Sequence, residues 1–139
     1  MAIPKDALQE ADFLRTLLAI LRMVTGYCFM LHGMSKLFGV PFDERFADVH
    51  LFSLMGLAGV LEFFGGLLIL LGLFTRPVAF VLSGMMAVAY FMAHAGWGDF
   101  WLPLINHGEA AVLYCFIFLF LAAAGAGNFS LDNLGRRYD

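Results

Sequence analysis

Charged residues are scarce in this sequence. Asp, Glu, Lys and Arg make up 14% of its 139 residues, whereas a soluble domain carries about 25%. Hydrophobic residues account for 62% of the chain, and the mean hydropathy is +0.85. This composition excludes an ordinary water-soluble domain and predicts a membrane protein in contact with the lipid bilayer. The length predicts one domain, spanning residues 1–139.

Motifs of soluble redox proteins and of nucleic-acid-binding proteins are also missing. The formal net charge is −3 and no run of Lys or Arg occurs, which excludes a nucleic-acid partner. Cys28 and Cys115 lie inside apolar runs and form no CxxC pair, so a thioredoxin-like centre has no support. The chain also lacks dinucleotide-binding and haem-attachment motifs. Any electrons that pass through this protein would therefore be carried by a quinone or by a partner protein.

Four apolar segments approach the length of a membrane-spanning helix. The hydrocarbon core of a bilayer is about 30 Å thick, and about 20 helical residues cross it. The segments are residues 14–37, 51–74, 77–94 and 108–124. We expect an all-α membrane protein in which four transmembrane helices form a bundle. Aromatic residues near 40–50 and 97–101 predict short interfacial helices in the outer loops.

Basic residues near the ends of these spans predict the orientation, because Lys and Arg are retained on the cytoplasmic side of a membrane. The side that holds the N-terminus carries most of them, whereas the other side has Lys36 and Arg45. The residues on the N-terminal side are Lys5, Arg15, Arg76, Arg136 and Arg137. We expect a multi-pass protein of the bacterial inner (cytoplasmic) membrane with both termini in the cytoplasm.

Two charged residues lie inside the predicted spans. Arg22 falls in the first span and Glu62 in the second, and counting from the span ends puts both near the midplane. Charged groups in hydrocarbon usually pair with one another and mark functional sites. We therefore predict an ion pair between Arg22 and Glu62. The alternative is that this pair only fixes the register of the helices.

A second group of polar residues gathers at the outer ends of the spans. It comprises His32 and Lys36 in the first span, His94 at the end of the third, and His107 and Glu109 at the start of the fourth. Imidazole and carboxylate groups bind zinc, copper or iron, so the three histidines and Glu109 are candidate metal ligands. The alternative is that these side chains are solvated or cap helix ends, since no HxxxH or ExxH motif occurs.

An apolar ring such as a quinone would bind in a slot between helices. Such slots are lined by apolar and aromatic side chains with a few polar groups. The 16 Phe and 8 Met residues of this chain suit the lining. Arg22, His32 and His94 are candidates to give hydrogen bonds or protons to the carbonyls of the ring. The alternative is that Phe and Met serve only packing and lipid contact.

Several short motifs occur in a fixed order between Arg22 and Asp132. They are Arg22 with Gly26, His32–Leu37 (HGMSKL), Leu61–Gly66 (LEFFGG), Leu71–Arg76 (LGLFTR), Asn106–Glu109 (NHGE), Gly125–Gly127 (GAG) and Ser130–Asp132 (SLD). Together they resemble the DoxX family of small bacterial and archaeal membrane proteins. The resemblance implies a four-helix membrane fold. It also implies a link to redox systems such as thiosulfate:quinone oxidoreductase, complexes that include superoxide dismutase, and resistance to quinones, catechols and thiol stress.

These observations lead to one leading hypothesis and two alternatives. The leading hypothesis is a membrane subunit of a redox system that binds a quinone between helices, with Arg22 and Glu62 at the inner wall. His32, Lys36, His94, His107 and Glu109 would then form the outer mouth. The first alternative is a non-catalytic anchor or assembly partner for a soluble oxidoreductase. The second is a small transporter or proton relay, which in four helices would require a homo-oligomer.

Overall fold

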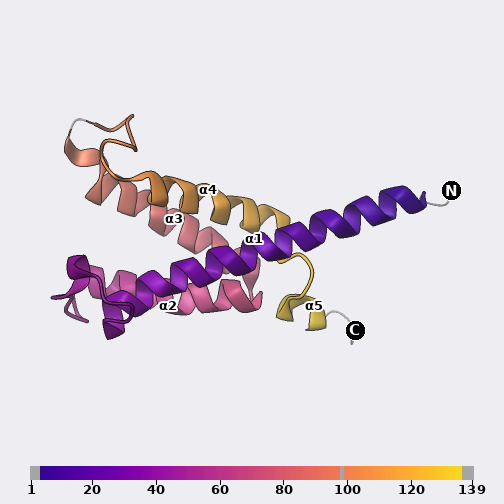
Figure 1. Ribbon diagram of the computed structural model, residues 1–139, viewed down its shortest axis with the longest axis horizontal. Coiled ribbons are helices and arrows are strands. Elements are labelled where there is room, and N and C mark those ends of the chain that lie inside the picture. The colour runs from indigo at the N-terminus through magenta and orange to yellow at the C-terminus, as the bar shows by residue number, and fades with distance from the viewer. Residues whose placement is uncertain (1–3, 98, 136–139) are drawn as a thin grey trace.

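The computed structural model describes residues 4–97 and 99–135, and every regular element in them is helical. The elements are α1 (Lys5–Phe38), η1 (Glu44–Phe46), α2 (Leu54–Leu71), α3 (Thr75–Ala93), η2 (Ala95–Trp97), α4 (Glu109–Ala124) and α5 (Leu131–Gly135) (Figure 1). The predicted all-α fold is confirmed. By length and composition, α1, α2 and α3 are able to cross a membrane, whereas α4 is apolar but shorter. The count of four spans therefore stays a prediction.

Helix α1 begins well before the predicted span. It has 34 residues and so is about 51 Å long, which exceeds the bilayer core of about 30 Å. Its first turns hold good helix formers, and Asp6 lies where the helix dipole favours an acidic residue. The hydropathy of the sequence did not predict the residues of α1 before residue 14, because hydropathy indicates contact with lipid and not helix formation. Figure 1 shows the N-terminal end of α1 projecting beyond the other helices.

The two long connections contain single helical turns where interfacial helices were predicted. The first connection, residues 39–53, holds the three-residue η1, and η2 opens the connection between α3 and α4. The side chain of Trp97 and the residues Arg136 and Arg137 lie outside the described part of the chain. Both connections lie at one end of the bundle, which we call the mouth end. The α2–α3 turn and residues 125–135 lie at the other, which we call the turn end (Figure 1).

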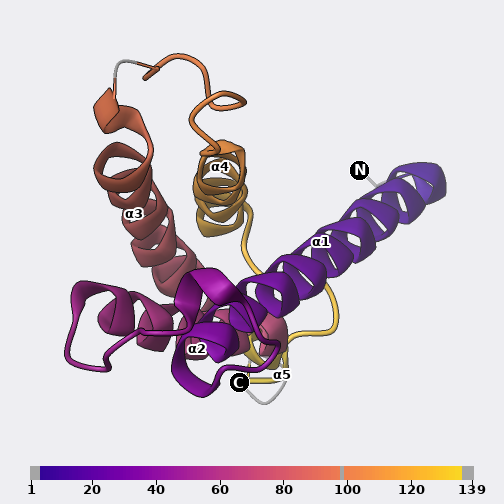
Figure 2. The same cartoon turned by 60° about the vertical axis from the view of Figure 1, so that its left-hand side comes forward.

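The helices pack as two pairs, α1 with α2 and α3 with α4 (Figure 2). Glycines bring α1 and α2 close together. A Cβ atom added to Gly26 would lie 2.5 Å from the backbone nitrogen of Leu70 and 2.8 Å from the carbonyl oxygen of Gly66. Small residues of this kind allow membrane helices to approach closely. Gly26 therefore lies where a larger side chain would push α1 and α2 apart.

The buried core lies where the two pairs meet. It consists of Phe29 from α1, Ile69 from α2, Ala79, Leu82 and Met86 from α3, and Phe118 and Leu121 from α4. The rings of Phe29 and Phe118 meet edge to face with centroids 4.8 Å apart. In each of the three long helices at most 33% of the apolar window is buried. Most of the apolar surface therefore faces outward, as a lipid environment requires.

Candidate functional site

The predicted ion pair between Arg22 and Glu62 is wrong. Arg22 is fully buried and donates all its hydrogen bonds to backbone carbonyls at the turn end. A guanidinium has five N–H groups, and each finds an acceptor. The acceptors are the carbonyl oxygens of Ile69 (2.9 Å) and Leu70 (2.7 Å) in α2, and of Ala126 (2.8 Å), Asn128 (3.4 Å) and Phe129 (2.9 Å) after α4.

Arg22 binds at the turn end and not to Glu62 because the C-terminal end of α2 offers it carbonyl groups. The last carbonyls of a helix have no partner within the helix, and its negative dipole end attracts a cation. Arg22 lies level with Ile69 and Leu70 because α1 and α2 are antiparallel, and it satisfies both carbonyls. Glu62 lies about two turns farther toward the mouth end. Arg22 therefore ties two segments together and has no N–H group free for a ligand.

Two more charged residues close the turn end in the same way. The Asp132 carboxylate accepts hydrogen bonds from the backbone N–H groups of Phe74 (2.7 Å) and Thr75 (2.9 Å), which start α3. Arg76 donates to the carbonyls of Ala122 (3.1 Å) and Ala123 at the end of α4. The LGLFTR, GAG and SLD motifs thus meet at this end, where they satisfy helix termini. Their arrangement is structural.

The partner of Glu62 is Lys36, at the mouth end. The Lys36 Nζ atom lies 2.5 Å from Glu62 Oε1 and 2.7 Å from Oε2. The two side chains are only 8% and 5% exposed. The Nζ atom also lies 4.9 Å from the ring centroid of Phe46 in η1, a cation–π distance. Each buried charge is compensated by the other, which is the condition for keeping both ionised away from water.

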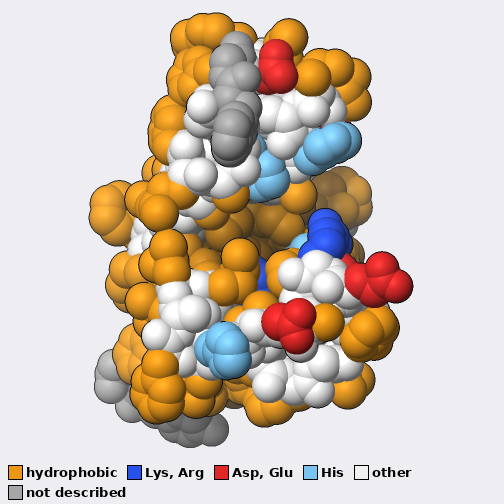
Figure 3. Space-filling view, turned by 90° about the vertical axis from the view of Figure 1, so that its left-hand side faces the viewer, with side chains coloured by type: hydrophobic (Ala, Val, Ile, Leu, Met, Phe, Trp, Pro, Cys, Tyr) orange, Lys and Arg blue, Asp and Glu red, His pale blue; other side chains and the backbone are white. Residues whose placement is uncertain are grey.

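A cavity of about 740 Å³ lies between the two helix pairs beside this ion pair. All four long helices, the first connection and the connection between α3 and α4 line it, mostly with Leu, Met and Ala side chains. Of the predicted site residues, His32, Lys36, Glu62, His94 and His107 line the cavity, whereas Arg22 and Glu109 do not. Figure 3, a view onto the mouth end, shows a hollow with hydrophobic walls and with basic side chains and histidines around it.

The position of His94 is fixed by Asn106. Nδ1 of His94 lies 2.9 Å from the carbonyl oxygen of Asn106. A carbonyl only accepts hydrogen bonds, so Nδ1 carries the proton and, in the neutral ring, Nε2 is an acceptor. The Asn106 side chain donates to Tyr90 Oη (3.0 Å) and to the carbonyl of Asp99 (2.9 Å). This network ties the connection between α3 and α4 to the end of α3, and sequence reasoning missed Tyr90.

His32 and Tyr114 supply polar atoms to the cavity without a protein partner. Their rings meet edge to face with centroids 6.1 Å apart. Neither the His32 nitrogens nor the Tyr114 hydroxyl makes a hydrogen bond to another described residue, and neither is sealed off from solvent. These atoms are therefore open to a ligand. Sequence reasoning overlooked Tyr114 because it lies inside the apolar run of α4.

The candidate metal ligands do not converge. Among the described residues, no three His, Cys, Asp or Glu side chains lie close enough together to hold a metal ion. Glu109 is exposed at the first position of α4, where the helix dipole favours a carboxylate. His94 is occupied at Nδ1 by Asn106. The geometry therefore does not support the metal alternative at this mouth.

An exposed ion pair lies at the rim of the cavity. Arg45 donates to both carboxylate oxygens of Asp43, with Nη2 2.6 Å from Oδ2. The side-chain hydrogen bonds from Arg45, followed by one from its backbone N–H, lower the pKa of Asp43 to about 2. The guanidinium of Arg45 lies 5.4 Å from the Phe46 ring. Phe46 thus contacts two cations, Lys36 and Arg45, which joins the rim to the buried pair.

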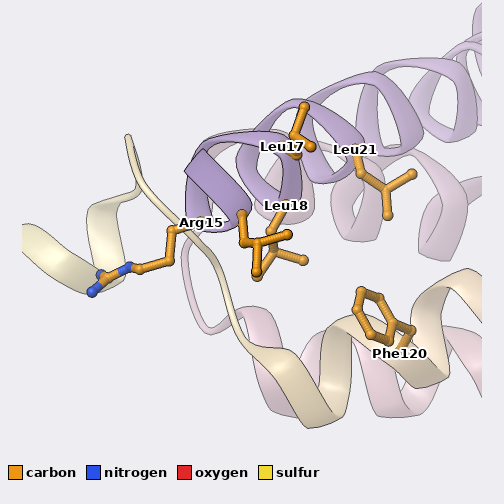
Figure 4. Close-up of a pocket in the computed structure, with 6 residues that line it drawn as sticks. Arg15, Leu17, Leu18, Leu21 and Phe120 are labelled. Carbon is orange, nitrogen blue, oxygen red and sulfur yellow. The ribbon is translucent and has the colours of Figure 1, made fainter. Parts of the chain in front are cut away.

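A second hollow of about 490 Å³ lies between α1 and α4 toward the turn end. Its lining is apolar except for Arg15, and Figure 4 shows the Arg15 side chain directed away from Leu17, Leu18, Leu21 and Phe120. No polar group is therefore placed to orient a ligand there. This hollow is the kind of surface that acyl chains of lipid fill.

These features define a helical membrane protein whose described residues form, at the mouth end, an apolar cavity with a few polar groups. The DoxX family model matches residues 17–95 of this chain. An uncharacterized protein from Haemophilus influenzae is 46% identical over 118 residues, which cover 84% of this chain and 88% of that protein. No solved structure matches significantly. The chain belongs to the DoxX family, and the resemblance seen in its motifs is confirmed.

Proposed function

We propose that this protein is the membrane subunit of a redox system and binds a quinone, or a similar apolar ring, in the mouth-end cavity. The observation that carries the proposal is the combination of an apolar lining with open polar atoms on His32 and Tyr114. Ligand pockets typically measure about 300–1,000 Å³ and combine apolar walls with a few polar groups. A cavity of about 740 Å³ fits a quinone ring with part of its tail.

The residues around the cavity have distinct roles in this proposal. His32 and the Tyr114 hydroxyl donate hydrogen bonds to the carbonyl oxygens of the ring, which orients it. The Lys36 ammonium, held beside the ring by the ionised Glu62, gives a proton to the reduced ring and is reprotonated from water before it gives the second. Reduction of a quinone to a hydroquinone takes up two electrons and two protons. In this proposal a partner redox protein supplies the electrons, and the cavity residues handle the protons.

The proposal includes the orientation in the bacterial inner membrane. Arg15 and Arg76 lie toward the turn end, as does the N-terminal extension of α1 with Lys5, whereas Lys36 and Arg45 lie at the mouth end. Basic residues favour the cytoplasmic side. We therefore place the turn end and both termini in the cytoplasm and the cavity toward the outer leaflet.

An anchor role for a soluble oxidoreductase is the second candidate. It is favoured by the N-terminal part of α1, where every described side chain from Lys5 to Arg15 is exposed. That segment would offer a helical surface to a cytoplasmic partner. The transporter alternative has less support, because Arg22, Arg76 and Asp132 close the turn end with backbone hydrogen bonds.

Ligand titration tests the proposed function. Protein in lipid nanodiscs is titrated with menadione, a naphthoquinone, and binding is followed by tryptophan quenching. We expect saturable binding that His32→Phe weakens about fivefold, the equivalent of roughly 1 kcal/mol for one hydrogen bond. Glu109→Gln, at an exposed position outside the cavity, serves as the control and leaves binding unchanged. Absence of saturable binding to the unmodified protein contradicts the proposal.

A further inference from the structure

The two sides of the cavity differ in how far their large apolar residues are buried. On the side of α1 and α4, Phe29 is 1% exposed and Tyr114 is half-buried. On the side of α2 and α3, residues that line the same cavity are largely exposed. They are Leu54 (66%), Leu57 (53%) and Leu61 (37%) of α2, and Val88 (56%) and Met92 (63%) of α3.

The packing of the helices explains this difference. Helix α2 packs chiefly on α1, and α3 packs chiefly on α4, so backbone contacts between the two pairs are few on both sides, between α2 and α3 and between α1 and α4. The side chains that fill each side therefore decide which one is open. Helices α2 and α3 are joined at the turn end by the tight turn at Gly72–Phe74, and Figure 2 shows them diverging from it. On the opposite side, the rings of Phe29, Tyr114 and Phe118 meet with centroids 4.8 to 5.9 Å apart and close the wall.

We propose that the cavity opens sideways into the lipid through a slot between α2 and α3, and that its ligand is a membrane-dissolved amphiphile. This inference rests on the proposed function and adds the shape and the route of the ligand. The polar ring lies beside Lys36, Glu62 and His32, and an apolar tail leaves between Leu57 and Val88. The tail replaces lipid at side chains that are already exposed to it, so the slot costs no desolvation of polar groups.

A pair of valines on one face of α3 provides a matched test. Val88 lines the cavity and is 56% exposed. Val81 lies seven residues earlier on the same face of α3, toward the turn end and outside the cavity, and is 58% exposed. Val88→Phe and Val81→Phe are titrated in nanodiscs with menadione and with a menadione analogue that carries a decyl tail. Each ligand is compared between variants, so that its partitioning into the bilayer cancels.

We expect Val88→Phe to weaken binding of the tailed ligand about fivefold or more, since overpacking by one ring costs about 1 kcal/mol or more. It should weaken menadione binding less, because menadione has no tail, and Val81→Phe should change neither ligand. An equal effect of Val88→Phe on both ligands, or no effect on either, overturns the slot. If neither ligand binds the unmodified protein, the proposed function fails and the slot is decided by a second measurement.

That second measurement needs no quinone. Tyr114→Trp and Phe118→Trp are made separately in a chain that also carries Trp97→Phe and Trp101→Phe. Lipids with brominated acyl chains then quench the fluorescence of the new indole. Position 114 lines the cavity and position 118 is 0% exposed in the core, so we expect stronger quenching at 114. Equal quenching at both positions would show a closed slot, including one covered by a second copy of the chain.

Discussion

The turn end and the mouth end of this bundle use charged residues in opposite ways. At the turn end, the donors of Arg22 and the carboxylate of Asp132 are bound to backbone groups. At the mouth end, Lys36 and Glu62 bind each other, and open polar atoms of His32 and Tyr114 stand beside them. An ionisable residue inside a membrane is therefore not enough to mark a site. What distinguishes the mouth end is that ionisable side chains beside a cavity keep polar atoms without a protein partner.

The largest expected effect comes from Arg22→Met. It leaves the carbonyls of Leu70, Ala126, Asn128 and Phe129 without a donor, whereas Ile69 keeps the N–H of Gly72, and each unsatisfied buried group costs about 1–3 kcal/mol. We expect a loss of about 4 kcal/mol or more, measured as a large fall in the unfolding temperature in mild detergent. Arg15→Met, an exposed arginine on the same helix, should have little effect. Similar stability of the two variants would contradict the structural role that we assign to Arg22 at the turn end.

A smaller effect is expected at the mouth end, and a second substitution should reverse it. Lys36→Met leaves the buried Glu62 carboxylate unpaired, which typically costs about 3–5 kcal/mol. The double variant Lys36→Met/Glu62→Leu removes both charges and should regain most of the stability, because such pairs are often replaceable by apolar residues. Both variants are compared by thermal unfolding. A double variant as unstable as the single one would show that the pair is structural, like Arg22.

The smallest expected effect on stability concerns the exposed ion pair between Asp43 and Arg45 at the rim of the cavity. Arg45 lowers the pKa of Asp43 from 3.8 to about 2. A lowered pKa in the folded protein gives stability that is fully present above the unfolded value and is lost as the pH falls through about 2. The difference in stability between the unmodified protein and Asp43→Asn should therefore be present at neutral pH, shrink as the pH falls toward 2 and vanish below it. Asp48→Asn, an exposed residue of the same connection, is the control; a difference that persists in acid contradicts the assignment.

Sequence reasoning located most of the helices because apolar runs have sharp edges. The spans predicted at 51–74, 77–94 and 108–124 correspond to α2, α3 and α4 with shifts of a few residues. The start of α1 could not be found from hydropathy, since Lys5 to Asp12 form a polar helix. The resemblance to the DoxX family, which was drawn from several short motifs in order, is confirmed by the family match over residues 17–95.

The partners of the charged residues were harder to predict, because the prediction compared depths and ignored the direction of side chains. Lys36 is about 3 Å from the end of α1, and Glu62 is about 12 Å from the start of α2. Side chains tilt toward the N-terminus of their own helix. In antiparallel helices this brings Lys36 and Glu62 toward each other, whereas Arg22 leans toward the turn end. Backbone carbonyls, which accept from Arg22, carry no signal in the sequence.

Helix α1 runs without interruption from the exposed Lys5 to Phe38. The same helix carries Arg22, which is fixed to the turn end, and Lys36, which is bound to Glu62 in the cavity wall. One continuous rod of hydrogen-bonded backbone therefore connects the exposed N-terminal segment, the turn end and the wall of the cavity.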